Sequence, residues 1–187
     1  MDAITLLKTD HKAVEKLFKQ YEKAGDNAFK TKQEVVAKII EELAIHAAIE
    51  EQVFYPAIRK EVGDVEDDVL EGLEEHHIVK WTLSELEGMA ADEERFNAKV
   101  TVLIESVRHH VEEEEGEMFP AVRAALGRKR LGEIGDALAK AKKGAPTRPH
   151  PKAPDVPPGN VVAGAVSAPL DKALNAGKDL VKKATKR

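Results

Sequence analysis

The chain has 187 residues, a formal net charge of −5 and no cysteine, and its length suits one ordinary domain with additional segments. Because there is no cysteine, disulfides, iron–sulfur clusters and thiolate zinc sites are excluded, and any metal must be held by nitrogen and oxygen. No apolar run approaches the roughly 20 residues that span a bilayer, and the N-terminus does not read as a signal peptide, so we expect a cytoplasmic protein without a transmembrane segment.

Charge is unevenly distributed along the chain. Residues 1–143 carry 21 Lys and Arg against 31 Asp and Glu, a net charge of −10, whereas residues 144–187 carry 8 against 3, a net charge of +5. An acidic body joined to a basic tail indicates two units. The acidic body argues against nucleic acid as a partner.

Pro and Gly divide the first unit into helical segments. The first helix is expected to begin near Asp2, a candidate N-cap, and to end at Gly25. The later helices are expected at about 31–56, 64–90, 94–120 and 129–143, the last with an apolar stripe. Four long helices joined by short loops predict an all-α, antiparallel up-down-up-down four-helix bundle with a short fifth helix.

The second unit has a different composition. Residues 144–168 are rich in Pro, Gly and Ala, which predicts a flexible linker that builds no core of its own. The residues after it predict a short basic amphipathic helix. Two interpretations of this tail stay open, namely contact with a membrane surface or an acidic protein, and a frayed, solvated end.

The body contains an internal repeat. HAAIEEQVFYP begins at His46 and HVEEEEGEMFP begins at His110, and both fit H-x-x-x-E-E-x-x-[FM]-[YF]-P. Another histidine precedes each copy, His11 in DHKAVEKLF and His76 in EHHIVKWTL, at separations of 35 and 34 residues. The body therefore reads as two helix pairs, each with one His on its first helix and H-x-x-x-E on its second.

Each long helix has one apolar seam in which spacings of three and four residues alternate, and this spacing keeps side chains on one face. Every seam is interrupted by His, or by His and Glu. Because the helices of a bundle pack seam to seam, these polar side chains should meet in its centre. They are His11, His46, Glu50, His76, His110 and Glu114.

A buried ionised carboxylate costs several kcal/mol unless it is compensated. The compensation comes either from protonated histidines or from bound cations. The H-x-x-x-E spacing favours cations, because it presents a nitrogen and an oxygen to the same point. Four imidazoles and two carboxylates suit iron, manganese or zinc, and two carboxylates can bridge a metal pair. Such a set leaves positions for an oxo or hydroxo bridge or an incoming small molecule.

At this point the sequence resembles the hemerythrin/HHE cation-binding family over about residues 2–123, in DHKAVEKLF, HAAIEEQVFYP, EEHHIVK and HHVEEEEGEMFP. The resemblance implies an antiparallel four-helix bundle with two non-haem iron ions (Fe2+/Fe3+), held by the same six side chains. Family members bind oxygen, sense oxygen, nitric oxide or iron, or handle peroxide. The oxygen carriers have a histidine one turn after the position of His76, where this chain has Lys80, and their last carboxylate is an Asp spaced differently from Glu114.

Some neighbouring residues are alternatives or additions to this set. Tyr55, Glu51 and Glu115 are candidates for extra ligands or for hydrogen-bond partners of the ligands. His77 replaces His76 if its helix is rotated. A ferritin-like site is a competing interpretation, because Glu74 and His77 fit Glu-x-x-His, but this motif has no second copy.

Three functions follow. The first is a di-iron protein that binds or senses oxygen, nitric oxide or iron. The second is an enzyme that decomposes hydrogen peroxide as a catalase does, since a missing fifth histidine leaves more open coordination. The third is a metal-free helical interaction module. The sequence does not separate the first two, so it leaves open whether the protein is an enzyme.

Overall fold

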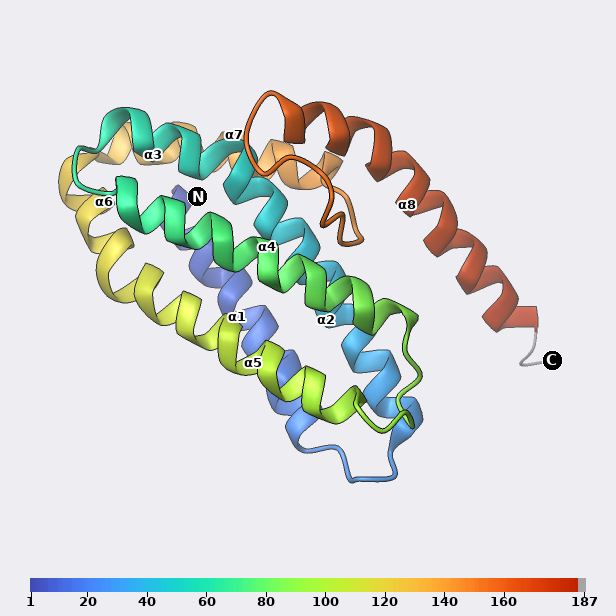
Figure 1. Cartoon of the computed structure of the whole chain (residues 1–187). Coiled ribbons are helices and arrows are strands. Elements are labelled where there is room, and N and C mark those ends of the chain that lie inside the picture. Colours follow the sequence, from blue (N-terminus) through green and yellow to red (C-terminus); the bar gives the residue numbers. More distant parts are fainter. Residues whose placement is uncertain (185–187) are drawn as a thin grey trace.

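The structure, a computed structural model, describes the backbone of residues 1–184 and the side chains of residues 1–176. This part of the chain contains only helices and loops, which confirms the predicted fold class. The long helices form an antiparallel bundle (Figure 1). They are α1 (Ala3–Glu22), α2 (Phe29–Ile49), α4 (Glu66–Gly88) and α5 (Phe96–Glu113).

The first helix begins as the sequence predicts. The side chain of Asp2 accepts a hydrogen bond from the Thr5 backbone N–H at 2.9 Å, and this bond satisfies one of the amides left free at a helix start. The predicted fifth helix is α7 (Arg128–Gly144), which buries its apolar stripe of Leu131, Ile134 and Leu138. It crosses the start of α1 so closely at Gly135 that a Cβ there would lie 2.2 Å from the Met1 carbonyl oxygen.

The two expected helix ends near Pro56 and Pro120 are wrong. Instead, α2 continues through a π-helical turn, η1 (Glu50–Phe54), into α3 (Tyr55–Glu61). Likewise α5 continues through η2 (Glu114–Met118) into α6 (Phe119–Ala125). A proline lacks the N–H that an α-helix requires. The wider π turn, whose hydrogen bonds join residues five apart, lets the chain remain helical past the proline.

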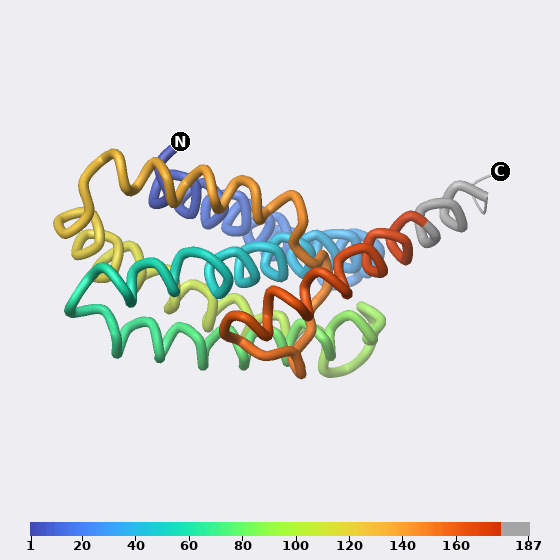
Figure 2. Tube along the Cα trace, turned by 90° about the horizontal axis from the view of Figure 1, so that it is seen from above, coloured from blue at the N-terminus to red at the C-terminus, as the bar shows by residue number. Residues whose placement is uncertain are grey.

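The tail also differs from the sequence prediction. A long helix, α8 (Gly159–Ala184), begins inside the stretch expected to be a linker, and it lies outside the bundle (Figures 1 and 2). The Asp171 carboxylate is buried and accepts from the Thr147 N–H at 3.2 Å. Gly164 permits a close approach, since a Cβ there would lie 3.0 Å from the Gln52 side-chain amide. The small residues that suggested a linker are therefore what allows this helix to pack.

The outer side of α8 exposes apolar side chains, among them Leu170 and Leu174. The contact expected between this tail and a membrane or protein surface stays a prediction. In the part of the chain that the structure describes, no helix has the length and apolar character to cross a membrane.

The core of the bundle consists of two apolar clusters. One lies where α3, α6 and α7 close the end of the bundle and includes Leu7 and Ile58. The other fills the opposite half and includes Val14 and Leu83. His11 lies between Leu7 and Val14 on α1 and is also buried. The bundle therefore holds a polar layer between two apolar clusters.

Candidate metal centre

The polar layer brings together all six side chains of the seams. Nε2 of His11 lies 3.2 Å from Nε2 of His46, and Nε2 of His76 lies 3.2 Å from Nε2 of His110. The ligand atoms form two overlapping groups, in each of which they lie within 4.8 Å of one another. The groups are His11, His46, Glu50 and Glu114, and Glu50, His76 and His110. Glu50 belongs to both.

The carboxylates of this layer are buried without enough hydrogen-bond donors. Glu50 is 0% exposed and Glu114 is 1% exposed. Neither oxygen of Glu50 has a hydrogen-bond partner, and neither does Oε2 of Glu114. Buried acceptors without partners are costly. The Oε2 atoms of both carboxylates lie within 3.7 Å of imidazole Nε2 atoms, which come from the four long helices of the bundle. The donor set, nitrogen and oxygen without sulfur, therefore fits cations such as iron, manganese or zinc.

Each histidine turns its other ring nitrogen toward an outer carboxylate. Nδ1 of His11 lies 2.9 Å from Glu115, that of His76 lies 3.1 Å from Glu51, and that of His110 lies 2.6 Å from Glu75. Nδ1 of His46 lies 3.9 Å from Asp10. Partners of this kind fix the ring and the tautomer of metal-binding histidines. The Nε2 atoms of His11, His76 and His110 are thereby directed into the layer, whereas Nδ1 of His46 has no hydrogen-bond partner.

Two of these outer carboxylates, Asp10 and Glu75, were missed in the sequence. The signal was present in the repeat, because Asp10 immediately precedes His11 and Glu75 immediately precedes His76, the first histidine of each helix pair. Lysines neutralise three of the outer carboxylates, and they lie on other helices of the bundle. The pairs are Lys8–Glu115 at 2.8 Å, Lys80–Glu51 at 2.9 Å and Lys142–Asp10 at 2.6 Å.

Protons balance the buried charges when no cation is bound. Burial alone lowers the pKa of His46, but the carboxylates of Glu50, Asp10 and Glu114 outweigh it and raise the pKa to about 10. Burial likewise disfavours the protonated form of His110, but the carboxylates of Glu114, Glu75 and Glu50 outweigh it and raise the pKa of His110 to about 9. Protons on these histidines therefore compete with a metal ion for the ring nitrogens.

The remaining groups of the layer are shifted in different directions. Burial raises the pKa of Glu50, and repulsion from Glu114 adds to this. Burial acts in the same direction on Glu114, but His110, His11 and His46 outweigh it and lower its pKa to about 2. Burial and the neighbouring histidines lower the pKa of His76 well below its usual value. Perturbations of opposite sign in one buried cluster are typical of functional sites.

Tyr55 lies beside the layer as a hydrogen-bond donor. Its hydroxyl donates to Oε1 of Glu114 at 3.0 Å, and burial with the nearby carboxylates raises its pKa well above 10. Gly72 makes room for it, since a Cβ there would lie 2.9 Å from the hydroxyl oxygen. The second repeat has Phe119 instead, whose ring stacks on His11 at 5.8 Å between centroids. Only one half of the layer therefore has a phenol.

Replacing this phenol gives a direct test of its role. We expect Tyr55→Phe to weaken metal binding about tenfold, the lower end of the effect of removing a hydrogen-bond partner of a ligand. A phenolate bound to Fe3+ gives a visible charge-transfer band. Because we expect Tyr55 to donate a hydrogen bond to Glu114 and not to bind iron, the visible spectrum of the iron-loaded variant should keep every band of the parent. Titration with Fe2+ and visible spectra measure the two effects. Tyr21→Phe, which removes a hydroxyl bonded to Asn97 instead, is the control, and loss of a band in Tyr55→Phe would make Tyr55 a ligand.

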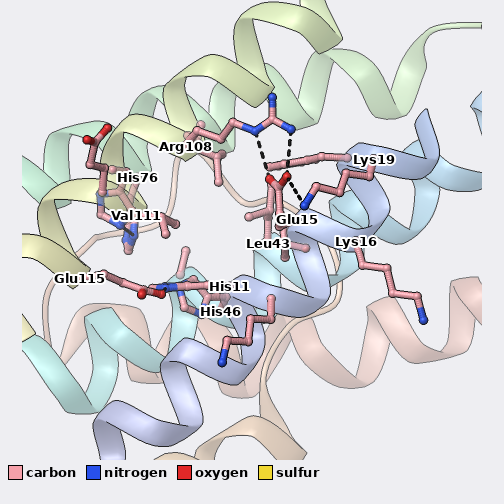
Figure 3. Close-up of a pocket in the computed structure, with 18 residues that line it drawn as sticks. His11, Glu15, Lys16, Lys19, Leu43, His46, His76, Arg108, Val111 and Glu115 are labelled. Carbon is pink, nitrogen blue, oxygen red and sulfur yellow. Dashed lines mark hydrogen bonds and ion pairs between the residues drawn. The ribbon is translucent and has the colours of Figure 1, made fainter. Parts of the chain in front are cut away.

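A cavity of about 610 Å3 reaches the layer from the side, between α1 and α5. α1 packs mainly on α2 and α5 mainly on α4, which leaves this space between the two pairs. All four histidines contribute to its lining (Figure 3). Its outer part is bridged by Arg108 on α5, which pairs with Glu15 and Glu22 on α1. A small molecule can therefore approach the Nε2 atoms without unfolding the bundle.

The alternative residues lie outside the layer. The side chain of His77 is 46% exposed and lies 3.7 Å from Asp155, so the rotated register is wrong. Glu74 is also exposed, and the structure therefore does not support the ferritin-like arrangement. Glu51 and Glu115 contact the histidines on Nδ1, the side away from the layer.

Residues 2–122 match the hemerythrin HHE cation binding domain. The chain belongs to this family. Its fold is also similar to the crystal structure of a hemerythrin HHE cation binding domain-containing protein from Mycobacterium kansasii, with a TM-score of 0.65 and 24% identity. That likeness covers 76% of this chain and 86% of the other. The hemerythrin domain of this chain thus contains the buried His/Glu clusters that suit a cation-binding site.

Two curated proteins are similar in sequence. An uncharacterized hemerythrin-like protein of Schizosaccharomyces pombe is 31% identical over 164 residues, which are 87% of this chain and 80% of that protein. A protein of Nostoc named DNA nickase is 30% identical over 126 residues, 67% of this chain. The match spans only 35% of the Nostoc protein, so most of that protein has no counterpart in the match.

Proposed function

We propose that this hemerythrin-like chain binds two iron ions in the polar layer and uses them to bind or sense oxygen, nitric oxide or iron itself. One observation carries the proposal. Two His/Glu groups share Glu50, and three of their buried carboxylate oxygens lack hydrogen-bond partners. The six side chains of the layer would hold the pair, and bound iron would supply coordination and redox chemistry.

The surrounding residues support this role in three ways. The outer carboxylates direct the Nε2 atoms of His11, His76 and His110 inward and increase the basicity of these rings. Tyr55 donates to Glu114 and holds that carboxylate in place. The cavity between α1 and α5 gives a small molecule access to the layer from the side, while the apolar clusters exclude water from both ends of the layer.

The decisive experiment measures iron per chain, the visible spectrum and oxygen release after peroxide is added. We expect close to two irons per chain, visible bands of a bridged pair and no rapid turnover of peroxide. Iron-replete expression that gives a chain without metal overturns the proposal. His46→Ala and His110→Ala test the ligands directly, and unchanged iron content in both variants would contradict the assignment.

A second candidate is a peroxide-decomposing enzyme, and one contact favours it. Lys80 occupies the position where oxygen carriers have a further histidine, and its Nζ lies 2.9 Å from Glu51, outside the layer. The layer therefore offers fewer protein ligands than the oxygen carriers have, which leaves more positions for peroxide. Catalytic oxygen release in the experiment above would favour this candidate over binding or sensing.

The access route makes a separate prediction. We expect Val111→Phe to narrow the cavity, because Val111 lines it beside the histidines (Figure 3). Iron content should not change, and the rate at which added nitric oxide reacts with the iron should fall about tenfold, the effect of about 1.4 kcal/mol on a barrier. Stopped-flow spectroscopy measures the rate. Val102→Phe is the matched control, since Val102 is exposed on the same helix and does not line the cavity. Equal rates in the parent and Val111→Phe would contradict this route.

A further inference from the structure

The segment after α7 returns to the bundle and contacts the surroundings of one histidine. The Asp155 carboxylate pairs with Nζ of Lys80. The same Nζ lies 2.9 and 3.1 Å from the two oxygens of Glu51, and Oε1 of Glu51 lies 3.1 Å from Nδ1 of His76. We call Lys80, Glu51 and His76 the Glu51 arm. An unbroken chain of polar contacts thus connects the C-terminal segment to a histidine of the layer.

A second contact from this segment reaches the backbone of the same arm. In the π turn the Tyr55 N–H donates to the Glu50 carbonyl, and Pro56, the next residue, has no N–H to give to the Glu51 carbonyl. Nδ2 of Asn160, a buried residue at the start of α8, donates to this carbonyl at 3.1 Å. Asn160 therefore supplies the hydrogen bond that the helix itself cannot make.

The other half of the layer provides an internal comparison. There Lys8, Glu115 and His11 form the equivalent Glu115 arm, with contacts of 2.8 and 2.9 Å. The Glu115 side chain is 28% exposed, whereas that of Glu51 is 5% exposed. The C-terminal segment therefore covers one arm, and the bundle alone holds the equivalent side chains of the other arm together.

We propose that Asp155 and Asn160 are positioning residues for His76, an inference that rests on the proposed metal-binding function. Asp155 neutralises and holds Lys80, Asn160 holds the backbone of Glu51, and Glu51 then fixes the His76 ring with Nε2 toward His110 and Glu50. The segment that follows the hemerythrin domain thus completes half of the centre, as partners of metal ligands do in other sites.

The first measurement uses the full-length, metal-free chain labelled with 15N. NMR shifts of the ring nitrogens report which nitrogen of His76 carries the proton. We expect one tautomer, protonated on Nδ1, in the parent chain, and a mixture of tautomers in Asp155→Asn and Asn160→Ala. Asp155→Glu, which keeps the carboxylate, should resemble the parent. The His11 signals should be the same in all four chains.

The second measurement follows the release of Fe2+ from the loaded full-length chain to a chelator. We expect Asp155→Asn and Asn160→Ala to release one of two equivalents about tenfold faster, with the other equivalent unchanged. Asn175→Ala is the control, because Asn175 bonds Thr147 and Arg148 within the same segment and away from Glu51. Lys8→Ala should instead alter the His11 signals.

Each outcome bears on one of the two proposals. Parent-like tautomers in both Asp155→Asn and Asn160→Ala overturn the positioning role. Equal changes at His11 and His76, or the same effects in Asn175→Ala, also overturn it, because they indicate general loosening. A parent chain that binds no Fe2+ overturns the proposed function, while the metal-free spectra still decide whether the C-terminal segment positions His76.

Discussion

Glu50→Gln is expected to abolish the binding of both metal ions, whereas Glu114→Gln is expected to affect mainly one. Glu50 is the single residue that belongs to both His/Glu groups, and Gln replaces its charge with a neutral amide of nearly equal size. We expect metal affinity to fall at least 100-fold, about 3 kcal/mol. Metal analysis after dialysis, together with titration of Fe2+ into the metal-free chain, measures the loss.

This variant should still fold. Burial and Glu114 raise the pKa of Glu50, but its carboxylate is also the strongest contributor to the raised pKa of His46, so its charge contributes part of the stability of the metal-free chain. Removing one partner of a buried charge pair costs about 3 kcal/mol, so we expect the free energy of unfolding of the metal-free variant to fall by about this amount near pH 7. Glu112→Gln, the same change at an exposed position near η2, should keep both ions. Two ions retained by Glu50→Gln would contradict the shared role of Glu50.

The metal-free chain is expected to lose stability as the pH rises from 6.5 toward 10, and the metal-bound chain is not. The folded pKa values of His46 and His110, about 10 and about 9, lie above the ordinary value of 6.5. Below pH 6.5 both histidines are protonated in the folded and unfolded chains, so their stabilising effect is fully present. Between pH 6.5 and 10 the unfolded chain loses these protons first, and the effect is lost.

The expected loss is large because the neighbouring carboxylates raise both pKa values by more than two units despite burial. Each pKa unit corresponds to about 1.4 kcal/mol, so the shifts of the two histidines, from 6.5 to about 10 and about 9, together contribute on the order of 8 kcal/mol. Urea unfolding between pH 6 and 10, with and without Fe2+, measures the difference. A bound cation takes the place of these protons, so metal uptake near pH 7 should release protons into the solvent. A metal-free chain whose stability rises toward pH 10 would contradict this account. His109→Gln, which replaces an exposed histidine, is the control and should show the same pH dependence as the parent.

The C-terminal segment shows where the sequence was misleading. Its Pro, Gly and Ala content predicted a linker, yet Ala168 is 3% exposed and Asn160 is 5% exposed. Composition reports how much apolar area a segment can bury by itself, and it does not report whether another surface fits it. The packing of α8 on the bundle uses the Glu51 carbonyl, which accepts from Asn160. This carbonyl is free because it lies in the π turn η1, and the sequence predicted a helix end at this place.

The sequence by itself determined the repeat, the apolar seams and the six inward side chains. It could do so because residues three and four apart share a face of any α-helix, whatever packs against it. Only the tertiary structure decided between His76 and His77, which lie about 100° apart around one helix. It also decided which glutamates serve the histidines, since Glu51 reaches His76 and Glu115 reaches His11 across different helices. Such pairings depend on how the helices pack against one another, and the spacing of residues within one helix does not predict them.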